Sequence, residues 1–466
     1  MNPAPCPSCV MFQEQVMEKD KKIVELQAQA VQLRYELNEV RDKWFSRRKK
    51  KQDPEVEPEP KKRGAKPGHP GWYRPEPAKI DHTEEVTLDI CPDCKKADLS
   101  SCGDIEEHVQ EDITLPEVKV TCFRRHSYWC RNCKKVVSRK GDEEVPNSII
   151  GPKAKAVAAF LKYEIKVSER DIQKLFKELC NLKIAASSIP GFHNQLRKKG
   201  QSLYELLKEQ IKKAPYLHAD ETGAPLDGKK AWDWVFATTH ICLHVLRQSR
   251  GQKVVEEILG KRYEGILLSD FLSAYHALDA KAKQRCLIHL LRDLKKALEC
   301  SEADDPVHVY CQRLKDLIQS AIDLQEQWEA KTILPETFES NRKTLEESLA
   351  DFQFPDPQKG ILRRMSKRLG RHRQELFTFL KYPELHLPYH NNHAERLIRP
   401  SVILRKITFG HRSPKGQENH SVIMSLHQTA HLNGKPTLPL FHKLMTASKP
   451  PSLDWCLSAV QAGPSP

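Results

Sequence analysis

The feature that most constrains the fold is a nearly continuous apolar run that ends in an acid, EGILLSD at residues 264–270. A strand of this composition is expected to be buried on both faces, as in a sheet that helices cover on both sides. Three strand-like runs precede it: PYLHADETGAP, AWDWVFATTH and ICLHVLRQSR. A short helix in GQKVVEEILG, closed by Gly260, separates the third run from the fourth.

A helical segment in FLSAYHAL and another strand candidate in QRCLIHL follow the fourth run. Three strands, helix, strand, helix and strand is the order of a ribonuclease-H-like fold, predicted here as an α/β domain over residues 213–440. Asp220 falls on the first strand and Asp270 at the end of the fourth. Acids at these positions can meet above the sheet, where open α/β sheets commonly have their sites.

Residues from about 297 to 385 are strongly charged and largely helical in pattern, which predicts a helical insertion before the final helix. Its basic run RRMSKRLGRHR is either a DNA-facing patch or a solvated helix face. The next segment, YHNNHAERLIRP, carries Glu395 on a helix that we expect to begin near Asn391 or Asn392. Arg396, Arg399, Arg405 and Lys406 surround this acid and are candidate DNA contacts.

Asp220, Asp270 and Glu395 have the chemistry of a site for two Mg²⁺ or Mn²⁺ ions, because hard cations prefer oxygen ligands. Two such ions can activate an attacking oxygen and stabilise a leaving one in phosphodiester chemistry. Each acid has an alternative. Asp220 could be a turn residue with Glu221 as the ligand, Asp270 could cap a helix, and Glu395 could pair with Arg399 one turn later.

Charge and cysteine content indicate the partner and the compartment. The chain of 466 residues has a formal net charge of +14, much of it clustered, which favours a polyanionic partner. Nucleic acid is preferred over a membrane because no apolar run approaches transmembrane length. The first residues lack the pattern of a secretory signal, so we expect a cytoplasmic, nucleoid-associated protein of bacterial type. In a reducing compartment, C-x-x-C pairs indicate metal ligands rather than disulfides.

A regular spacing of three and four residues near the start predicts a coiled coil over residues 10–45. The positions with this spacing are Val16, Lys19, Ile23, Leu26, Ala30, Leu33, Leu37, Val40 and Trp44. A single amphipathic helix packed on the rest of the protein is the alternative. The coiled coil would make the chain a homo-oligomer.

A basic linker rich in Pro and Gly is predicted over residues 46–85. Its KKRGAKPGHPGWYR segment supplies Lys61, Lys62 and Arg63, which we expect to contact the DNA backbone without reading sequence. The same charges could simply solvate an extended segment.

Two C-x-x-C pairs flank a segment rich in strand-forming residues, which predicts a zinc-ribbon module over residues 86–140. The predicted ligands of a structural Zn²⁺ are Cys91, Cys94, Cys130 and Cys133. Each pair offers two thiolates from a tight turn, and together they complete a tetrahedral site. The module is basic, which favours DNA binding.

Residues 151–205 are expected to form a helical domain resembling a helix-turn-helix. Ser168 and Asp171 form an approximate capping box before the helical ERDIQKLFKEL, and a second, basic helix begins after Ser188. A helical hairpin that braces the next domain is the alternative.

Several of these stretches together resemble the DDE transposases of the insertion sequence 66 family. The matching stretches are KKRGAKPGHPG, the two zinc knuckles, HADETG with WDWV, ILLSDFLSAYHAL followed by RCLIHLLRDL, and NNHAERLIRPSVILRKITFGHRSPKGQENHSVIMSLHQTAHLNG. The resemblance implies that Asp220, Asp270 and Glu395 are the metal-binding triad. It covers most of the chain from about Lys61 to Gly434, and the last block is the most distinctive.

One segment departs from the family. Where the family has a pattern closer to Cys-Trp-x-His-x-Arg, this chain has Cys286-Leu-Ile-His289, with Arg292 three positions further on. The departure weakens any role for Cys286. His289 could contact DNA or the scissile phosphate, or it could be a structural histidine at the end of a strand.

The expected protein is a multidomain transposase that binds the terminal inverted repeats of its element and then cuts and joins DNA, with residues 441–466 as a C-terminal tail. Its expected partners are those repeats, target DNA and accessory proteins of the same element. A non-enzymatic zinc-ribbon DNA-binding regulator and a structure-selective nuclease with the same metal site are the alternatives.

Overall fold

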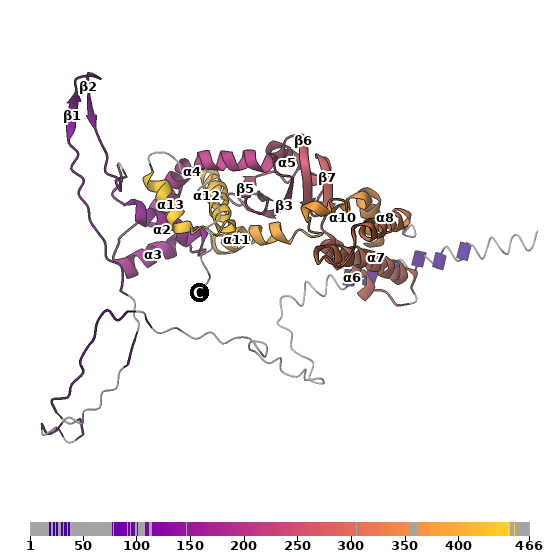
Figure 1. Cartoon of the computed structure of the whole chain (residues 1–466), viewed down its shortest axis with the longest axis horizontal. Helices are drawn as coiled ribbons and strands as arrows, with labels where there is room; N and C mark the ends of the chain where they lie inside the picture. Colours follow the sequence, from indigo (N-terminus) through magenta and orange to yellow (C-terminus); the bar gives the residue numbers. More distant parts are fainter. Residues whose placement is uncertain are drawn as a thin grey trace, which may run out of the picture. The chain divides into compact units, whose positions relative to one another are not determined.

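A computed structural model describes residues 114–145, 147–303, 305–353 and 361–447, Ser452, and scattered residues between 18 and 110 (Figure 1). The chain divides into two units, Lys43–Leu115 and the combination of Met1–Asp42 with Pro116–Pro466. The described helices and strands belong to the second unit.

The central element is a five-stranded sheet with the strand order β5-β4-β3-β6-β7. Its strands are β3 (Tyr216–Gly223), β4 (Trp232–Ala237), β5 (Cys242–Arg247), β6 (Arg262–Ser269) and β7 (Asp279–Arg285). The strands β3, β4 and β5 pair antiparallel with one another, whereas β6 pairs in parallel with both β3 and β7. The mixed sheet, with many helices around it, is compatible with the predicted ribonuclease-H-like domain.

Local sequence explains the first four strands. The apolar run of β6 is buried from Gly265 to Ser269, as expected for a central strand covered on both faces. The helix α5 (Gln252–Leu259) crosses from β5 to β6 and ends at Gly260, as predicted. Gly260 has a φ of +85°, a left-handed conformation that glycine adopts without a steric penalty.

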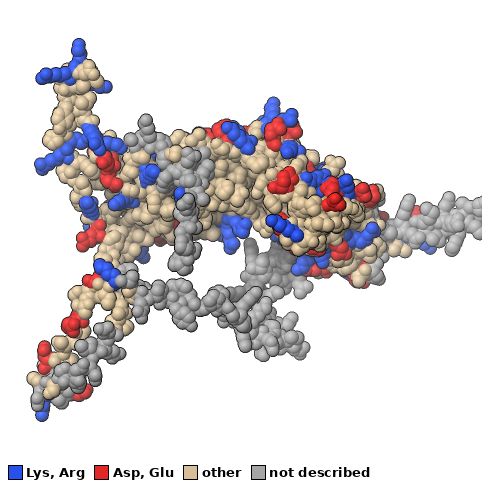
Figure 2. Space-filling model, in the orientation of Figure 1, with Lys and Arg blue, Asp and Glu red and all other residues tan. Residues whose placement is uncertain are grey.

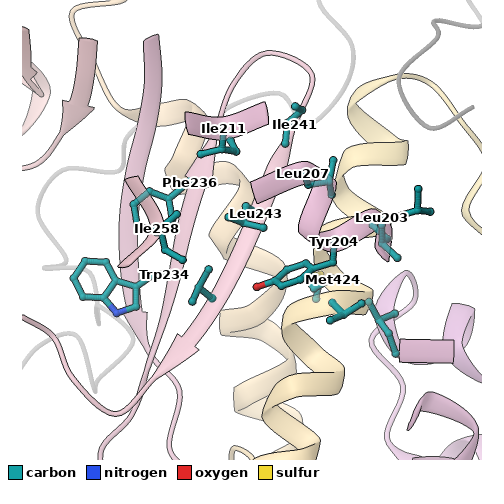
Figure 3. Packing of buried hydrophobic residues seen from close by; sticks show 14 of the residues in the cluster. Leu203, Tyr204, Leu207, Ile211, Trp234, Phe236, Ile241, Leu243, Ile258 and Met424 are labelled. Carbon is teal, nitrogen blue, oxygen red and sulfur yellow. The ribbon is translucent and has the colours of Figure 1, made fainter. Parts of the chain in front are cut away.

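One face of the sheet packs on α4 (Ile189–Lys212) and α5. Figure 3 shows Leu203, Leu207 and Ile211 of α4 packed near Phe236 and Leu243 of the sheet. These side chains belong to one large core that also includes residues of the last two helices. The helix α4 extends past the predicted domain end at residue 205 to Lys212, and it is the helix of this segment that packs on the sheet. DNA contact by these helices stays a prediction.

The opposite face of the sheet packs on α11 (Asn392–Thr408), which brings Leu397 and Ile398 against Val235 and Cys242. The helix α11 begins where the sequence predicts, at Asn392. Its position on this face carries Glu395 toward the strands that hold the other two acids.

The edge strand β5 is covered by α12 (Pro414–Leu432) through hydroxyl groups. The backbone N–H groups of Cys242, His244 and Leu246 donate to the hydroxyl oxygens of α12 at 2.8–3.2 Å. The accepting residues are Thr429, Ser425 and Ser421, which recur every four residues along one side of the helix. The donors recur every two residues along the strand, so a helix takes the place of a sixth strand at this edge.

Three further helices pack beside this core. They are α2 (Pro152–Tyr163), α3 (Glu169–Cys180) and α13 (Thr437–Thr446). The predicted cap at the start of α3 is confirmed, because the Ser168 hydroxyl accepts a hydrogen bond from the Asp171 N–H at 3.2 Å. The predicted boundary at residue 440 falls inside α13, whose Phe441 and Leu444 are buried, so the folded core continues beyond it.

The insertion predicted from about residue 297 to 385 corresponds to a helical region between β7 and α11 that begins earlier, at Leu287. It comprises α6 (Leu287–Glu299), α7 (Pro306–Glu329), α8 (Pro335–Asp351), α9 (Ile361–His372) and α10 (Thr378–Lys381). These elements form a second core with Ile266 and Leu268 of β6. The insertion is therefore anchored on β6, an interior strand of the sheet.

Two local predictions are wrong. The FLSAYHAL segment contains only a single 3₁₀ turn at Ser273–Tyr275, because the Tyr275 hydroxyl is tied to Glu221 and its ring is fully buried. The QRCLIHL segment is not one strand: β7 ends at Arg285 and α6 begins at Leu287. A short apolar run fits a buried strand and a buried helix equally well.

The N-terminal predictions are described only in part. The described residues between 18 and 37 are helical, and Ile23, Leu26, Leu33 and Leu37 are exposed. Cys91, Cys94 and the segment 61–63 lie outside the described residues. No helix in the part of the chain that the structure describes has the length and apolar composition needed to cross a bilayer.

Candidate active site

Asp220 and Asp270 lie at equivalent places on neighbouring parallel strands. His218 of β3 is paired with Leu268 of β6, and each acid follows its paired residue by two positions. Because β3 and β6 run in the same direction, both acids lie toward the carboxyl end of this parallel strand pair. The structure thus brings together two acids that are far apart in the sequence.

The electrostatics around Asp220 indicate that the predicted acids are close to one another. Burial raises the pKa of Asp220 to about 7, and the nearby carboxylates of Glu221, Asp270 and Glu395 contribute to that rise. A carboxyl group whose pKa is raised by other carboxylates is one whose ionised form a cation would stabilise.

Glu221 differs from Asp220 because its carboxylate is held within the protein. It accepts hydrogen bonds from Nη2 of Arg250 at 2.7 Å and from the hydroxyl of Tyr275 at 2.8 Å, and its side chain is 1% exposed. Asp220 accepts a hydrogen bond from the backbone N–H of Glu221 at 2.9 Å. The contacts of Glu221 thus favour Asp220 as the acid available to a cation.

Asp270 begins a tight turn that a buried arginine supports. Its carboxylate accepts from the N–H of Leu272 at 2.8 Å, which fixes the side chain at the end of β6. Nη1 of Arg285 donates to the backbone carbonyl of Asp270 at 2.7 Å and to the hydroxyl of Ser269 at 3.0 Å. Nε of the same guanidinium donates to Glu375 at 2.6 Å, so the insertion helps to hold this turn.

Asn391 positions Glu395 on the sheet, and sequence reasoning missed this role. Its side-chain amide donates to the carbonyl of Ala219 at 2.8 Å, and its Oδ1 lies 3.0 Å from Nδ1 of His218. Its carbonyl accepts from the N–H of Glu395 at 3.2 Å, in the first turn of α11. Asn391 therefore joins the start of α11 to the strand that carries Asp220.

His289 faces Glu395 from the first turn of α6, so it is not at the end of a strand. Its Nε2 lies 3.8 Å from Oε1 of Glu395. Among the described residues, Glu395 forms this ion pair and not the predicted one with Arg399. Sγ of Cys286, a ring nitrogen of His289 and a carboxylate oxygen of Glu395 lie within 4.8 Å of one another. Cys286 is buried, and burial raises the pKa of its thiol. His289 thus lies beside the predicted triad, where it can contact a bound phosphate.

The four basic residues predicted around Glu395 are all on α11, but their surroundings differ. Arg396, Arg399 and Lys406 are exposed. Arg405 is partly buried and donates hydrogen bonds to the carbonyl of Gly223 and to the hydroxyl of Thr222 at the end of β3. Arg405 therefore ties α11 to β3, and the three exposed residues are free of such a bond to the sheet.

The residues present fit a site for hard divalent cations. Asp220, Asp270 and Glu395 offer carboxylate oxygens, and Oε1 of Glu395 is buried without a hydrogen-bond partner among the described residues. Carboxylates with free oxygens are the ligands that Mg²⁺ and Mn²⁺ prefer. The assignment of these three acids as metal ligands stays a prediction.

Half of the predicted zinc ribbon is described. The strands β1 (Ser127–Cys130) and β2 (Lys135–Ser138) form an antiparallel hairpin, whose turn contains Cys130 and Cys133. The N–H of Cys133 donates to Sγ of Cys130 at 3.4 Å, and hydrogen bonds from Cys133 lower the pKa of the Cys130 thiol. Exposed Lys and Arg side chains surround this turn, as Figure 2 shows. The turn has the form of a zinc knuckle, and zinc binding there stays a prediction.

The strand order, with Asp220 on β3 and Asp270 directly after β6, is compatible with a ribonuclease-H-like domain. Comparison with family models makes the assignment specific. The model described as Transposase IS66 family matches residues 147–419, which is more than half of the chain, and the chain belongs to this family. The matched residues include Asp220, Asp270 and Glu395. A comparison with curated proteins finds no match.

Proposed function

We propose that this transposase binds the ends of its mobile element and catalyses metal-dependent cleavage and strand transfer at Asp220, Asp270 and Glu395. The observation that carries the proposal is the registered placement of Asp220 and Asp270 on parallel strands, with Glu395 close enough to raise the pKa of Asp220. Membership in the IS66 family supports the same reaction class.

The three carboxylates are the proposed ligands of two Mg²⁺ or Mn²⁺ ions. When bound, such ions supply activation of the attacking oxygen and stabilisation of the leaving oxygen. The protein contributes the positions of the ligands: Asn391 fixes the start of α11 on β3, and Arg285 holds the backbone of Asp270. These contacts limit how far each carboxylate can move from the site.

The exposed basic residues of α11 are proposed to hold the DNA. Arg396, Arg399 and Lys406 lie on the helix that carries Glu395 and expose their charges. Charges of this kind bind phosphates without reading sequence. Arg405 would act indirectly, because its guanidinium already bonds to Thr222 and Gly223.

The decisive experiment incubates the full chain with labelled DNA that carries the inverted repeats found on either side of its reading frame. With Mg²⁺, the wild type should nick these ends and join them to target DNA. Asp270→Asn should bind the same DNA and neither cut nor join it. Asp279→Asn is the matched control, because Asp279 is exposed and begins β7 at the opposite end of the parallel strands.

The other outcomes separate the alternatives. DNA binding without cleavage by the wild type would contradict the proposal in favour of a non-enzymatic regulator. Cleavage without joining would favour a nuclease.

The N-terminal part is proposed to recognise and assemble. The zinc ribbon, with Cys91, Cys94, Cys130 and Cys133 as ligands of Zn²⁺, and the basic linker with Lys61, Lys62 and Arg63 would contact the element ends. The coiled coil would join chains so that two ends are held together. We place this activity on nucleoid DNA in a bacterial cytoplasm, with accessory proteins of the element as further partners.

Deletion of residues 10–45 tests the assembly role. Removing the apolar positions of the coil should lower the oligomeric mass in light scattering, because a coiled-coil seam is the only stabilising feature proposed for the assembly. An unchanged mass would contradict the assignment.

A further inference from the structure

A second group of potential metal ligands lies in the interior and shares no residue with the proposed catalytic site. Asp233 of β4, His244 of β5 and His420 of α12 converge from three elements. The side chains of Asp233 and His244 are fully buried, and that of His420 is 4% exposed. None of these residues is required by the proposed strand-transfer site.

Strand pairing explains why the first two side chains meet. Asp233 is paired with Leu246, and His244 is paired with Val235, so Asp233 and His244 are diagonal neighbours on one face of β4 and β5. The third side chain comes from α12, where His420 precedes Ser421, the first rung of the hydroxyl contacts to β5. The same contacts that attach α12 to the strand therefore deliver His420 to the pair.

The distances are compatible with three ligands of one ion. Nδ1 of His244 lies 3.0 Å from Oδ2 of Asp233, and Nε2 of His420 lies 3.6 Å from the same oxygen. Two ligands of a tetrahedral zinc ion, each about 2.1 Å from the metal, are about 3.4 Å apart. The two observed distances bracket that separation, whereas 3.6 Å is too long for a hydrogen bond.

The contacts around the cluster are those that support metal ligands. The Ser401 hydroxyl lies 2.8 Å from Nε2 of His420. Oδ1 of Asp233 is buried and has no hydrogen-bond partner within the described ranges. A cation shared by Asp233, His244 and His420 would use all three side chains, and a bidentate carboxylate would use Oδ1 as well.

A cavity gives the cluster access. Its volume is about 640 Å³, and its lining includes Asp233, Ser401, His411 and His420. A metal site needs a route for the ion and an oxygen for its remaining ligand position. The cavity provides the route, and the Ser401 hydroxyl or a water molecule from the cavity provides the oxygen.

We propose that Asp233, His244 and His420 bind one Zn²⁺ ion, with an oxygen from the cavity side as fourth ligand. Two imidazoles and one carboxylate suit a borderline ion such as zinc, in contrast to the all-oxygen set of the catalytic acids. The ion would fasten α12 to the edge of the sheet.

The first test measures zinc per chain by elemental mass spectrometry in the full protein purified from zinc-supplemented cells. His420→Asn should carry one equivalent fewer than the wild type. His427→Asn is the matched control, because His427 is a buried histidine on the same helix outside the cluster, and it should keep the wild-type content. Equal zinc in the wild type and His420→Asn would overturn the proposal.

The second test separates this site from the cysteines and does not require the His420 variant to fold. A chain in which Cys91, Cys94, Cys130 and Cys133 are all changed to Ser should still bind one equivalent of Co²⁺. Its spectrum should contain ligand-field bands without the sulfur-to-cobalt charge-transfer absorption of a thiolate site. No bound cobalt in this folded variant, checked by circular dichroism, would overturn the proposal.

Discussion

Asp220 and Asp233 lie on the same face of adjacent strands and have opposite electrostatic surroundings. Asp220 is paired with Val235, and Asp233 is paired with Thr222, two positions from Asp220. Burial and neighbouring carboxylates raise the pKa of Asp220 to about 7. Burial acts in the same direction on Asp233, but the charge and hydrogen bond of His244 outweigh it and hold the pKa well below the usual value.

The comparison teaches that the companions of an acid, more than its strand position, determine which cation it suits. Asp220 has Asp270 and Glu395 beside it, an all-oxygen set that suits a hard ion. Asp233 has two imidazoles beside it, a mixed set that suits a borderline ion. On the proposed assignments, one face of the sheet would hold two kinds of cation site.

At the proposed catalytic site, replacing Asp220 should have the largest effect on the cleavage rate. Asp220→Asn should lower the rate of Mg²⁺-dependent strand cleavage by more than about 100-fold, because loss of a direct ligand exceeds the 10–100-fold cost of losing an outer partner. Glu221→Gln should cost less than about tenfold, since the glutamine oxygen can still accept from Arg250 and the Tyr275 hydroxyl can accept from the new amide NH₂ in place of donating. Cleavage of labelled element ends measures both rates, with DNA affinity as the control. A greater loss in Glu221→Gln would reverse the assignment of the two acids.

Replacing Asp233 tests the buried cluster that it forms with His244 and His420. With metal removed by a chelator, Asp233→Asn should lower the free energy of unfolding by about 3 kcal/mol, because His244 would lose the counter-charge of a buried pair. Denaturant unfolding followed by circular dichroism measures this difference. The exposed Asp279→Asn should change stability by less than about 0.5 kcal/mol. Equal stabilities of the two variants would mean that the pair contributes little.

Removing Asn391 sharpens the comparison by disturbing only the position of the acids. Asn391→Ala should slow cleavage about 10- to 100-fold, the cost of losing an outer partner, while the three carboxylates remain. Asn392→Ala, at the next position and in the same helix turn, should have little effect. Cleavage rates at saturating DNA make the measurement, and equal effects of the two variants would argue against a positioning role.

The smallest effect is expected at the contact that holds His244 in place. Ser425→Ala should cost about 1–2 kcal/mol of unfolding free energy, because the buried N–H of His244 would lose its acceptor. Ser320→Ala is the control, since its exposed hydroxyl bonds to a carbonyl of its own helix. If both variants were as stable as the wild type, the hydroxyl contacts to β5 would not stabilise the fold.

The parts of the fold that local patterns determine were predictable from the sequence. The strands β3 to β6, the end of α5 at Gly260, the cap at Ser168 and the start of α11 depend on apolar runs and capping residues that are adjacent in the chain. The FLSAYHAL segment failed because its conformation depends on a distant contact, from Tyr275 to Glu221. The QRCLIHL segment failed because strand and helix share its apolar pattern.

The predicted triad could be proposed from strand-end positions and the family resemblance, but its supports could not. Asn391 resembles any helix-starting asparagine in the sequence, and its bonds to His218 and Ala219 exist only after α11 packs on β3. Arg285 looks like a surface charge, yet it is fully buried under Asp270. The cluster of Asp233, His244 and His420 has no ligand spacing in the sequence, because three separate elements supply it.

The hydrogen bonds between α12 and β5 can continue over only a few residues. Four residues of a helix advance about 6.0 Å, whereas two residues of a strand advance about 6.8 Å. Each successive rung is therefore displaced by about 0.8 Å relative to the one before, on these ideal dimensions. The contacts at Ser421, Ser425 and Thr429 span two such steps, and a further rung would have to stretch its hydrogen bond. A helix can therefore cover this edge strand over only a few residues. The three hydrogen bonds fix one alignment of α12 along β5.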